Sequence, residues 1–495
     1  MAQSLPGWGG GRRATWAARV PILVVLGVIA WLVPAGTASS AVAHPTVEEA
    51  PAGLHGFPFS LGCCYYDFAD VGYTLEEYII SGEAKSYQGQ ETAPFKTRMI
   101  VAKPTDPAKF NGTVLAEWEN VSAQMPAEPG WVWMHNYGMD PVRGGYGFAA
   151  INAQKVGTDF LTKWDPVRYE GLNVPNDVYS FDVFSQAIDA LKNPTDVAPM
   201  EGMTVERVVG YGQSQSAGRL NTYMSGLTGT AADPVALTAI PRNDADVLDA
   251  VIVQADGGTK KRFPDLQIPL VHFETEDGIE VTPIHEDTDL ELYRLWEVVG
   301  SAHIGNEETQ SPGAPTLPVT WTAGVPIPWQ VDADYWEYSH YGEEGPSSAA
   351  ACFGSTEMPI RYALNAALEG LHHWLQGGPA LSQPPRAEFD ANGAIVKDEF
   401  GNAKGGLRLP PMRVPVAKYE ASTCGLLGST TPLTPAQLLE LYPTHEQYVA
   451  QMQAATDAAV TEGIILPKDG EQMMRKVNRS LIPLWRPSTG WGIVL

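Results

Sequence analysis

A serine between two small residues is the part of this chain whose type and spacing most favour chemistry. Residues 205–220 begin as an apolar, β-branched run and end as a helix-forming run, and Gly212 and Ser214 lie at the junction. A Gly-x-Ser-x-small turn between a strand and a helix is a nucleophile elbow, which lifts the serine hydroxyl clear of the sheet. Gly212 suits the turn because a side chain there would collide with neighbouring backbone. We therefore predict that Ser214 is a nucleophile and that Ser216 is the small residue, more often glycine, two positions later.

Ser216 is the alternative nucleophile, since Gly218 follows it by two residues. It lacks a glycine at the matching position before it, which Ser214 occupies. Ser216 would also lie within the predicted helix. We interpret it as a packing residue of the turn.

His303 is the predicted general base. A serine hydroxyl is a poor nucleophile until a base takes its proton, and with this turn the usual chain order is serine, acid and then histidine. Residues 292–299 form the last strand that we predict, and the Gly-Ser-Ala that follows leads into His303. His285 competes for the role, but it precedes that strand. His303 therefore has the expected place in the chain.

The acid that orients the histidine is expected in the loop after the strand predicted at 269–273. Three acids lie there: Glu274, Glu276 and Asp277. We expect Glu274 still to belong to the strand, whereas Glu276 faces the loop. We therefore favour Glu276 as the orienting acid, with Asp277 as the close alternative.

An acyl-transfer site also needs hydrogen-bond donors for the oxyanion of its tetrahedral intermediate. The backbone N–H of Gln215, at the start of the predicted helix, is the first expected donor. The second is expected in the loop after the strand at 112–118, around Asn120 and Val121. Gln154 follows the next strand and either braces the site or is an ordinary loop residue.

The elements that must position these residues alternate between strands and helices, which indicates a mostly parallel sheet. About eight strands are expected, the size of an α/β-hydrolase sheet flanked by helices. Residues 44–75 and 154–179 are expected to be irregular. Besides the strand that enters the elbow, the predicted strands are 78–87, 95–102, 112–118, 147–152, 248–254, 269–273 and 292–299, and the predicted helices include 131–139, 180–192 and 359–375.

Three segments are expected along the chain. Residues 1–43 resemble a signal peptide, with three early arginines, an apolar run at 20–33 and a cleavage signal at Ala41-Val42-Ala43. An uncleaved signal anchor is the alternative. Residues 44–377 form the predicted catalytic domain, and 378–495 form a C-terminal extension packed on it. We therefore expect a secreted or cell-envelope protein.

The composition narrows the class of partner. The 495 residues carry a formal charge of −25 and are 44% hydrophobic, which describes a well-buried, acidic globular chain. An acidic surface disfavours nucleic acid and anionic membranes as partners. We expect a small-molecule substrate, and no stable membrane partner after signal cleavage. The oligomeric state is left open.

Four cysteines remain in a chain expected to be exported, where disulfides persist. We favour a Cys352–Cys424 bridge and leave Cys63 and Cys64 undecided, because adjacent cysteines form a strained ring. No C-x-x-C pair or spaced His/Cys cluster is present, so no metal site is expected. The predicted serine chemistry needs no cofactor.

The chain resembles the bacterial family described as alpha/beta hydrolase domain proteins, many of them exported. The resemblance implies an α/β-hydrolase fold, Ser214 as nucleophile and His303 as base, and it implies no particular substrate. The family's acid loop resembles Ser/Thr-Glu-x-Asp; here Thr275-Glu276 matches but Gly278 replaces the aspartate, which supports Glu276. The matching stretches are 72–78, 117–122, 164–169, 179–187, 212–216, 296–303 and 401–410.

These residues predict a serine-dependent hydrolase that cleaves carboxylic esters through an acyl-enzyme. An amidase, a peptidase or an acyltransferase would use the same three residues and is the first alternative. A catalytically inactive binding protein on the same scaffold is the second, because a fold alone does not give a function.

Overall fold

The computed structural model describes residues 42–60, 68–87, 89, 91–130, 143–230, 233–236, 247–256, 266–281, 291–304, 356–423 and 425–483. Several predictions concern residues outside these ranges: nearly all of the signal peptide, the helix at 131–139, His285, and the four cysteines Cys63, Cys64, Cys352 and Cys424. None of the described helices is both long and apolar enough to cross a membrane.

Nine strands form one sheet within the described residues, in the order β1-β2-β3-β5-β4-β6-β9-β10-β11. The neighbours from β5 to β11 pair in parallel, whereas β1, β2, β3 and β5 pair in antiparallel fashion. This mostly parallel sheet confirms the predicted fold class. The strands are β1 (Thr46–Glu49), β2 (Tyr73–Lys85), β3 (Thr92–Pro104), β4 (Thr113–Trp118), β5 (Gly147–Ile151), β6 (Arg207–Gln213), β9 (Ala250–Gln254), β10 (Leu270–Thr275) and β11 (Tyr293–Val298).

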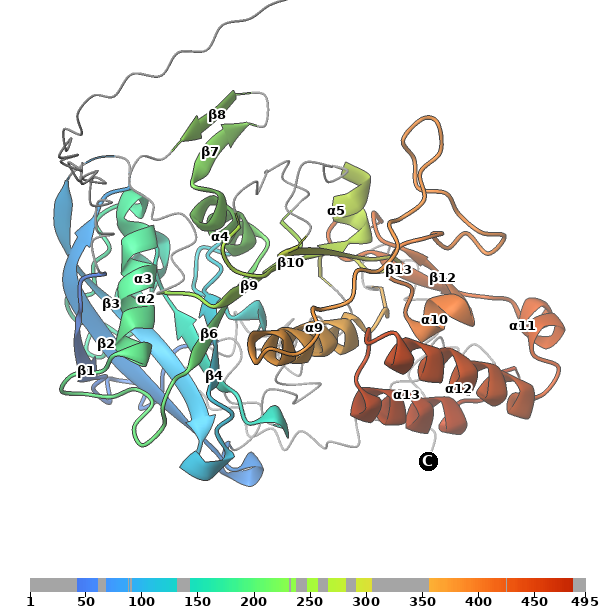
Figure 1. Cartoon of the computed structure of the whole chain (residues 1–495), viewed down its shortest axis with the longest axis horizontal. Coiled ribbons are helices and arrows are strands. Elements are labelled where there is room, and N and C mark those ends of the chain that lie inside the picture. The colour runs from blue at the N-terminus through green and yellow to red at the C-terminus, as the bar shows by residue number, and fades with distance from the viewer. Residues whose placement is uncertain are drawn as a thin grey trace, which may run out of the picture. The chain divides into compact units, whose positions relative to one another are not determined.

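Helices cover both faces of this sheet (Figure 1). Buried side chains of α3 and α4 pack with alternate residues of β9 and β10, such as Val253 and Leu270. Those of α9 pack with the opposite set, such as Ile252 and Phe273. Both faces of the strands are therefore buried, which explains why they are apolar runs rather than alternating ones. The helices are α2 (Lys155–Trp164), α3 (Ser180–Lys192), α4 (Gln215–Ser225), α5 (Glu276–Val281) and α9 (Ile360–Leu375).

Two local predictions were wrong. Residues 44–75, expected to be irregular, contain the edge strand β1, which pairs with β2 although only Val47 of its four side chains is buried. The expected loop at 154–179 contains α2, a helix that has a glycine and no side-chain cap at its start. Both elements form through tertiary contacts, because their own sequences favour them weakly.

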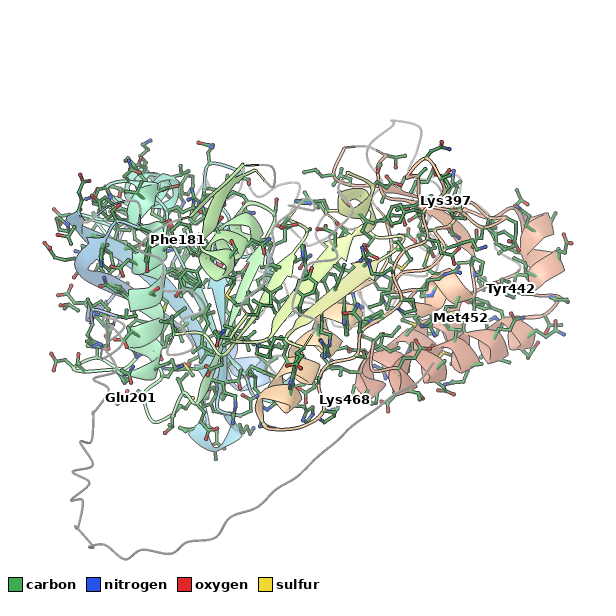
Figure 2. The ribbon with its side chains drawn as sticks, turned by 45° about the horizontal axis from the view of Figure 1, so that its top comes forward. Phe181, Glu201, Lys397, Tyr442, Met452 and Lys468 are labelled. Atoms are coloured by element: carbon green, nitrogen blue, oxygen red, sulfur yellow. The ribbon has the colours of Figure 1, made fainter. Side chains whose placement is uncertain are left out.

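The region after residue 378 shares the core beneath α9. Residues 42–495 form one compact unit, and Tyr442 and Met452 belong to the same buried cluster as Phe273 and Leu364 (Figure 2). Thr434 caps α11 through a capping box, and Thr444 accepts a bond from the Gln447 N–H at the start of α12. The elements are α10 (Pro410–Arg413), β12 (Ala417–Glu420), β13 (Ser429–Pro432), α11 (Pro435–Leu441), α12 (His445–Thr461) and α13 (Pro467–Arg479); a separate hairpin joins β7 (Leu227–Thr230) to β8 (Asp233–Ala236).

Candidate active site

Ser214 lies at the turn between β6 and α4 with a backbone conformation that serine rarely adopts. Its φ is 59° and its ψ is −119°. The Ser214 N–H donates to the Gln254 carbonyl at 2.8 Å, and the Ser214 carbonyl accepts from the Gly218 N–H at 3.0 Å. A Cβ added at Gly212 would come within 2.8 Å of the Ser216 backbone. The turn therefore depends on Gly212 and holds Ser214 in strain, as a nucleophile elbow does.

The strain predicts an unusual stability effect. Ser214→Gly should be about 1 kcal/mol more stable to urea than Ser214→Ala, because only glycine adopts this conformation without penalty. The exposed helix residue Ala454 is the control, since glycine there should cost about 1 kcal/mol. Equal stabilities of the two Ser214 variants would contradict a strained elbow.

Ser216 supports the turn from inside α4. Its hydroxyl donates to the Gln213 carbonyl at 2.9 Å and accepts from the Gln213 N–H at 3.0 Å, and its side chain is fully buried. Ser214 is only half-buried. Of the two serines, Ser216 is therefore fully engaged in holding the loop that presents Ser214.

The loop that carries His303 is tied to the elbow strand. The Gln213 side-chain amide donates to the His303 carbonyl at 3.3 Å, so His303 comes next to the residue that precedes Ser214. His303 is half-buried, and burial lowers the pKa of its imidazole below the ordinary value. The neutral form, which a general base needs, is therefore favoured at neutral pH.

Glu276 lies against the same loop. Its backbone N–H donates to the Ser301 carbonyl at 3.1 Å, and its carboxylate accepts from the Gly300 N–H at 2.5 Å. The other carboxylate oxygen pairs with Lys397, which comes from the C-terminal region (Figure 2). Burial raises the pKa of Glu276, whereas Lys397 opposes that shift. Glu276 is fully buried and is the first residue of α5, whereas the sequence pattern predicted a loop there.

Asp277 differs from Glu276 in its surroundings. It is half-buried, its Oδ1 atom makes no hydrogen bond within the described part of the chain, and burial raises its pKa to about 6. Among the described residues, the His303 ring is hydrogen-bonded neither to Ser214 nor to either acid. The structure thus brings the segments that carry Ser214, Glu276 and His303 together, without a bond from the His303 ring among the described residues.

The loop at Asn120 and Val121 meets the start of α4. The Asn120 side chain donates to the Gln213 carbonyl at 2.8 Å, and the Asn120 N–H is used by Ala127, so Asn120 braces the elbow. The Val121 N–H faces the Gln215 side-chain oxygen at 3.4 Å. Gln215 is the first residue of α4, where backbone N–H groups lack partners within the helix. The loop at Val121 therefore lies against the first turn of α4, with the Val121 N–H bonded to the Gln215 side chain.

Gln154 links these parts. Its Oε1 accepts from Trp118 at 3.1 Å and from the Gln215 side chain at 3.0 Å, and its Nε2 donates to Asp177 at 2.9 Å. Gln154 is buried and joins the β4 end to the first turn of α4. Gln154 therefore braces the β6–α4 turn, which is one of the two roles expected for it, and is not an ordinary loop residue.

Comparison with known proteins assigns the chain to a family. A family model described as "Alpha/beta hydrolase domain" matches residues 40–475. The chain belongs to the alpha/beta hydrolase domain family. Two solved structures are similar to part of this hydrolase. The structure of esterase Est22 has 12% identity and a TM-score of 0.25, and the match covers 41% of this chain and 51% of that chain. The structure of an alanine variant of the same esterase has 11% identity and a TM-score of 0.24, and the match covers 39% of this chain and 48% of that chain. The chain thus spans about half the length of these structures, and no curated protein matches it.

A buried charge network lies behind the Asn120 loop of this hydrolase. Arg98 is fully buried, and its guanidinium nitrogens lie 2.7 Å from Glu119, 3.3 Å from Glu77 and 3.3 Å from Glu128. Burial lowers the pKa of Arg98, but the carboxylates, Glu119 first, raise it above its ordinary value. Burial also raises the pKa of Glu119, against the effect of Arg98. Because Glu119 directly precedes Asn120, the network anchors the loop that offers the Val121 N–H.

The sequence reasoning missed a second cluster in this hydrolase. Asp256, His272 and Glu274 face one another across β9 and β10, in positions that sequence patterns assigned to a buried strand and a loop. The signal was present, since His272 and Glu274 alternate with apolar residues on one strand and so share a face. Lys397 was also missed, since it lies 121 residues from its partner Glu276.

Proposed function

We propose that this hydrolase cleaves carboxylic esters through an acyl-enzyme on Ser214, with His303 as general base and Glu276 as orienting acid. The observation that carries the proposal is the strained conformation of Ser214, φ 59° and ψ −119°, at a strand-to-helix turn bonded to the His303 loop. Such strain is characteristic of a nucleophile held for attack. Family membership supports hydrolysis in general, and the serine, acid and histidine order supports this mechanism in particular.

The reaction has two halves. Ser214 Oγ attacks the ester carbonyl carbon while His303 takes the hydroxyl proton, and His303 then gives that proton to the departing alcohol. The acyl group is left on Ser214 as an ester. A water molecule, deprotonated by His303, then attacks this acyl-enzyme, and His303 returns that proton to the departing Ser214 Oγ, which releases the carboxylic acid and free serine. In both halves the N–H of Gln215 would hold the oxyanion, joined by the N–H of Val121 once the Gln215 side chain releases it.

A partition experiment tests both the bond and the intermediate. The protein is given p-nitrophenyl butyrate and phenyl butyrate with added methanol, and butyric acid and methyl butyrate are measured. A common acyl-enzyme predicts the same product ratio from both esters, because the leaving group has gone before the acceptor attacks. A ratio that depends on the leaving group would contradict the acyl-enzyme. Faster cleavage of the matching anilide would favour an amidase.

The burial of His303 predicts the pH dependence of kcat/KM. A base works only when unprotonated, and the pKa of His303 is lowered from an ordinary value of about 6.5. Activity should therefore remain above half its maximum at pH 6.5 and fall only as the pH drops further. The measurement is a pH profile of kcat/KM, with circular dichroism confirming that the protein stays folded. A half-maximal point above pH 7 would contradict the lowered pKa.

Two isosteric variants separate the candidate acids. Glu276→Gln should lower kcat by about 10³–10⁴-fold with little change in KM, because the imidazole loses the anion that orients and stabilises it. Asp277→Asn should change kcat by less than about 10-fold. Lys397→Met serves as the control for lost ion pairing, since it disturbs Glu276 without removing its carboxylate. A larger kcat loss in Asp277→Asn than in Glu276→Gln would assign the role to Asp277.

A further inference from the structure

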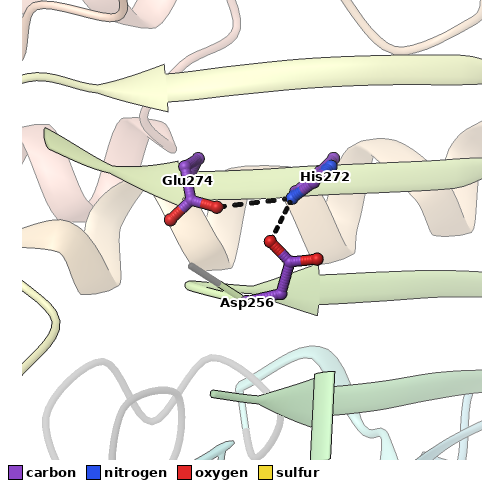
Figure 3. A group of neighbouring side chains, drawn as sticks. All are labelled: Asp256, His272 and Glu274. Atoms are coloured by element: carbon purple, nitrogen blue, oxygen red, sulfur yellow. Dashed lines mark hydrogen bonds and ion pairs between the residues drawn. The ribbon is translucent and has the colours of Figure 1, made fainter. Parts of the chain in front are cut away.

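Three buried side chains with metal-ligand chemistry converge beside the elbow (Figure 3). His272 Nε2 lies 3.1 Å from Asp256 Oδ1 and 3.4 Å from Glu274 Oε2, and the three side chains are at most 1% exposed. We propose that Asp256, His272 and Glu274 form a binding site for a divalent metal ion, Zn²⁺ in the first instance. The site is separate from Ser214, His303 and Glu276, and the proposal does not depend on ester hydrolysis.

The spacing of the three ligand atoms suits a metal ion. In tetrahedral zinc sites the metal–ligand distances are about 2.0–2.2 Å, which places neighbouring ligand atoms about 3.3–3.5 Å apart. The two distances from His272 Nε2 lie within about 0.2 Å of this range. All three ligand atoms lie within 4.8 Å of one another, so a single ion can reach them with small adjustments. Nitrogen and carboxylate oxygen donors together suit Zn²⁺.

In each of the three side chains, the nitrogen or oxygen that does not face the other two is hydrogen-bonded to another group. His272 Nδ1 bonds the Tyr293 hydroxyl at 2.9 Å, Asp256 Oδ2 accepts from the Asn221 side chain, and Glu274 Oε1 accepts from the Thr275 N–H at 3.1 Å. Outer hydrogen bonds of this kind fix the tautomer and the direction of metal ligands. With Nδ1–H directed to Tyr293, the lone pair of Nε2 points to the two carboxylates.

A single proton stabilises the Asp256 and Glu274 carboxylates less well than a divalent metal ion. Two carboxylates facing one another away from water need either a shared proton or a cation between them. A proton on His272 Nε2 can be donated along only one good hydrogen bond, yet two carboxylate oxygens compete for it at 3.1 and 3.4 Å. A divalent ion bonds all three donors at once and supplies charge for both carboxylates.

Two backbone features, at Ala255 and Gly278, allow the three ligands to come together. Ala255 has a φ of 50°, an uncommon value for alanine, and it turns the chain after β9 so that Asp256 reaches His272. A Cβ at Gly278 would lie 2.1 Å from Glu274 Oε1, so glycine makes room for that carboxylate. The ion would thus join the ends of β9 and β10. Gln254, whose carbonyl holds the Ser214 N–H, lies two residues before Asp256.

Metal content tests the proposal directly. Tag-free protein is dialysed against metal-free buffer, given one equivalent of Zn²⁺, dialysed again and measured by inductively coupled plasma mass spectrometry. Wild type should retain close to one ion per chain, whereas Asp256→Asn and Glu274→Gln should retain less than a tenth as much. His373→Gln is the control, because His373 pairs with Glu369 on the surface and is 61% exposed; it should behave as wild type.

Two further measurements keep the test independent of variant folding. Co²⁺ added to wild type should give the visible absorption of tetrahedral cobalt, and Zn²⁺ should raise Tm in a concentration-dependent way that a chelator reverses. Tyr293→Phe keeps all three ligands but loses the bond to Nδ1, so its Zn²⁺ affinity should fall about 10–100-fold. Wild type with no retained ion, no cobalt absorption and no Tm response would overturn the site and leave a proton-bridged cluster.

Discussion

Ser214→Ala is expected to lower kcat for p-nitrophenyl butyrate by about 10⁴–10⁶-fold while the protein remains folded. The reason is that no other group replaces the attacking oxygen, and removal of a triad serine leaves only the catalysis due to binding and the oxyanion hole. Alanine accepts the same backbone conformation as serine, so the elbow, including the 2.8 Å bond from residue 214 to the Gln254 carbonyl, should persist. The measurement is steady-state kinetics with urea unfolding of the same preparations.

Ser216→Ala is the matched control for this variant. It removes a hydroxyl two residues away that is buried and bonded to Gln213 on both sides. The unfolding free energy should fall by about 1–2 kcal/mol, because the Gln213 N–H loses its partner, while kcat stays within about 10-fold of wild type. A collapse of kcat in Ser216→Ala with activity retained in Ser214→Ala would exchange the roles of the two serines.

Arg98→Met is expected to lower the unfolding free energy by about 3–5 kcal/mol, the largest stability loss that the described ion pairs predict. The methionine fills similar space, but the fully buried carboxylates of Glu77, Glu119 and Glu128 lose the cation that they share. Arg168 still pairs with Glu77 at 2.5 Å, so the uncompensated charge falls mainly on Glu119 and Glu128. Urea unfolding measures the loss. Activity should also fall, because Glu119 anchors the Asn120 loop.

Two comparisons isolate the cause of that loss. Arg413→Met removes an arginine whose partner Glu462 is half-exposed, and it should cost less than about 1 kcal/mol. If Arg98→Met is too unstable to purify, adding Glu119→Gln and Glu128→Gln should recover a folded protein, since the stranded charges are then gone. No recovery in the triple variant, or equal losses for Arg98 and Arg413, would contradict the role assigned to the network.

The elbow and its partner loops follow from local patterns. An apolar run, a Gly-x-Ser turn and a helix-forming run lie in contiguous sequence at 205–220, so no distant contact is needed to recognise them. The places of His303 after β11 and Glu276 after β10 could be predicted from chain order, because parallel strands deliver their following segments to the same edge of the sheet, while their catalytic roles stay predictions. The exact environment of each residue was not predictable in this way. Glu276 is buried beside Lys397 because of a contact made across 121 residues.

Buried charges are the part of the fold that sequence patterns misjudge. Arg98, Glu119, His272 and Glu274 lie within or beside strands, where single-chain patterns treat a charged residue as exposed or as a strand end. Arg98 and Glu119 pair between β3 and the end of β4, and His272 faces Asp256, which follows β9. Such pairing depends on strand order and register, which adjacent residues do not determine. The shared face of His272 and Glu274 is visible in the sequence, but their meeting with Asp256 emerged only from the folded chain.

Covalent labelling shows whether Ser214 is an activated nucleophile. The folded protein is treated with a fluorophosphonate, which reacts with activated serines, and the adduct is located by peptide mass spectrometry. We expect one adduct per chain on Ser214, no adduct in Ser214→Ala, and none in wild type unfolded in urea, because activation requires the assembled loops. An unlabelled folded protein, or an adduct on any other residue, would contradict the assignment of Ser214 as the nucleophile.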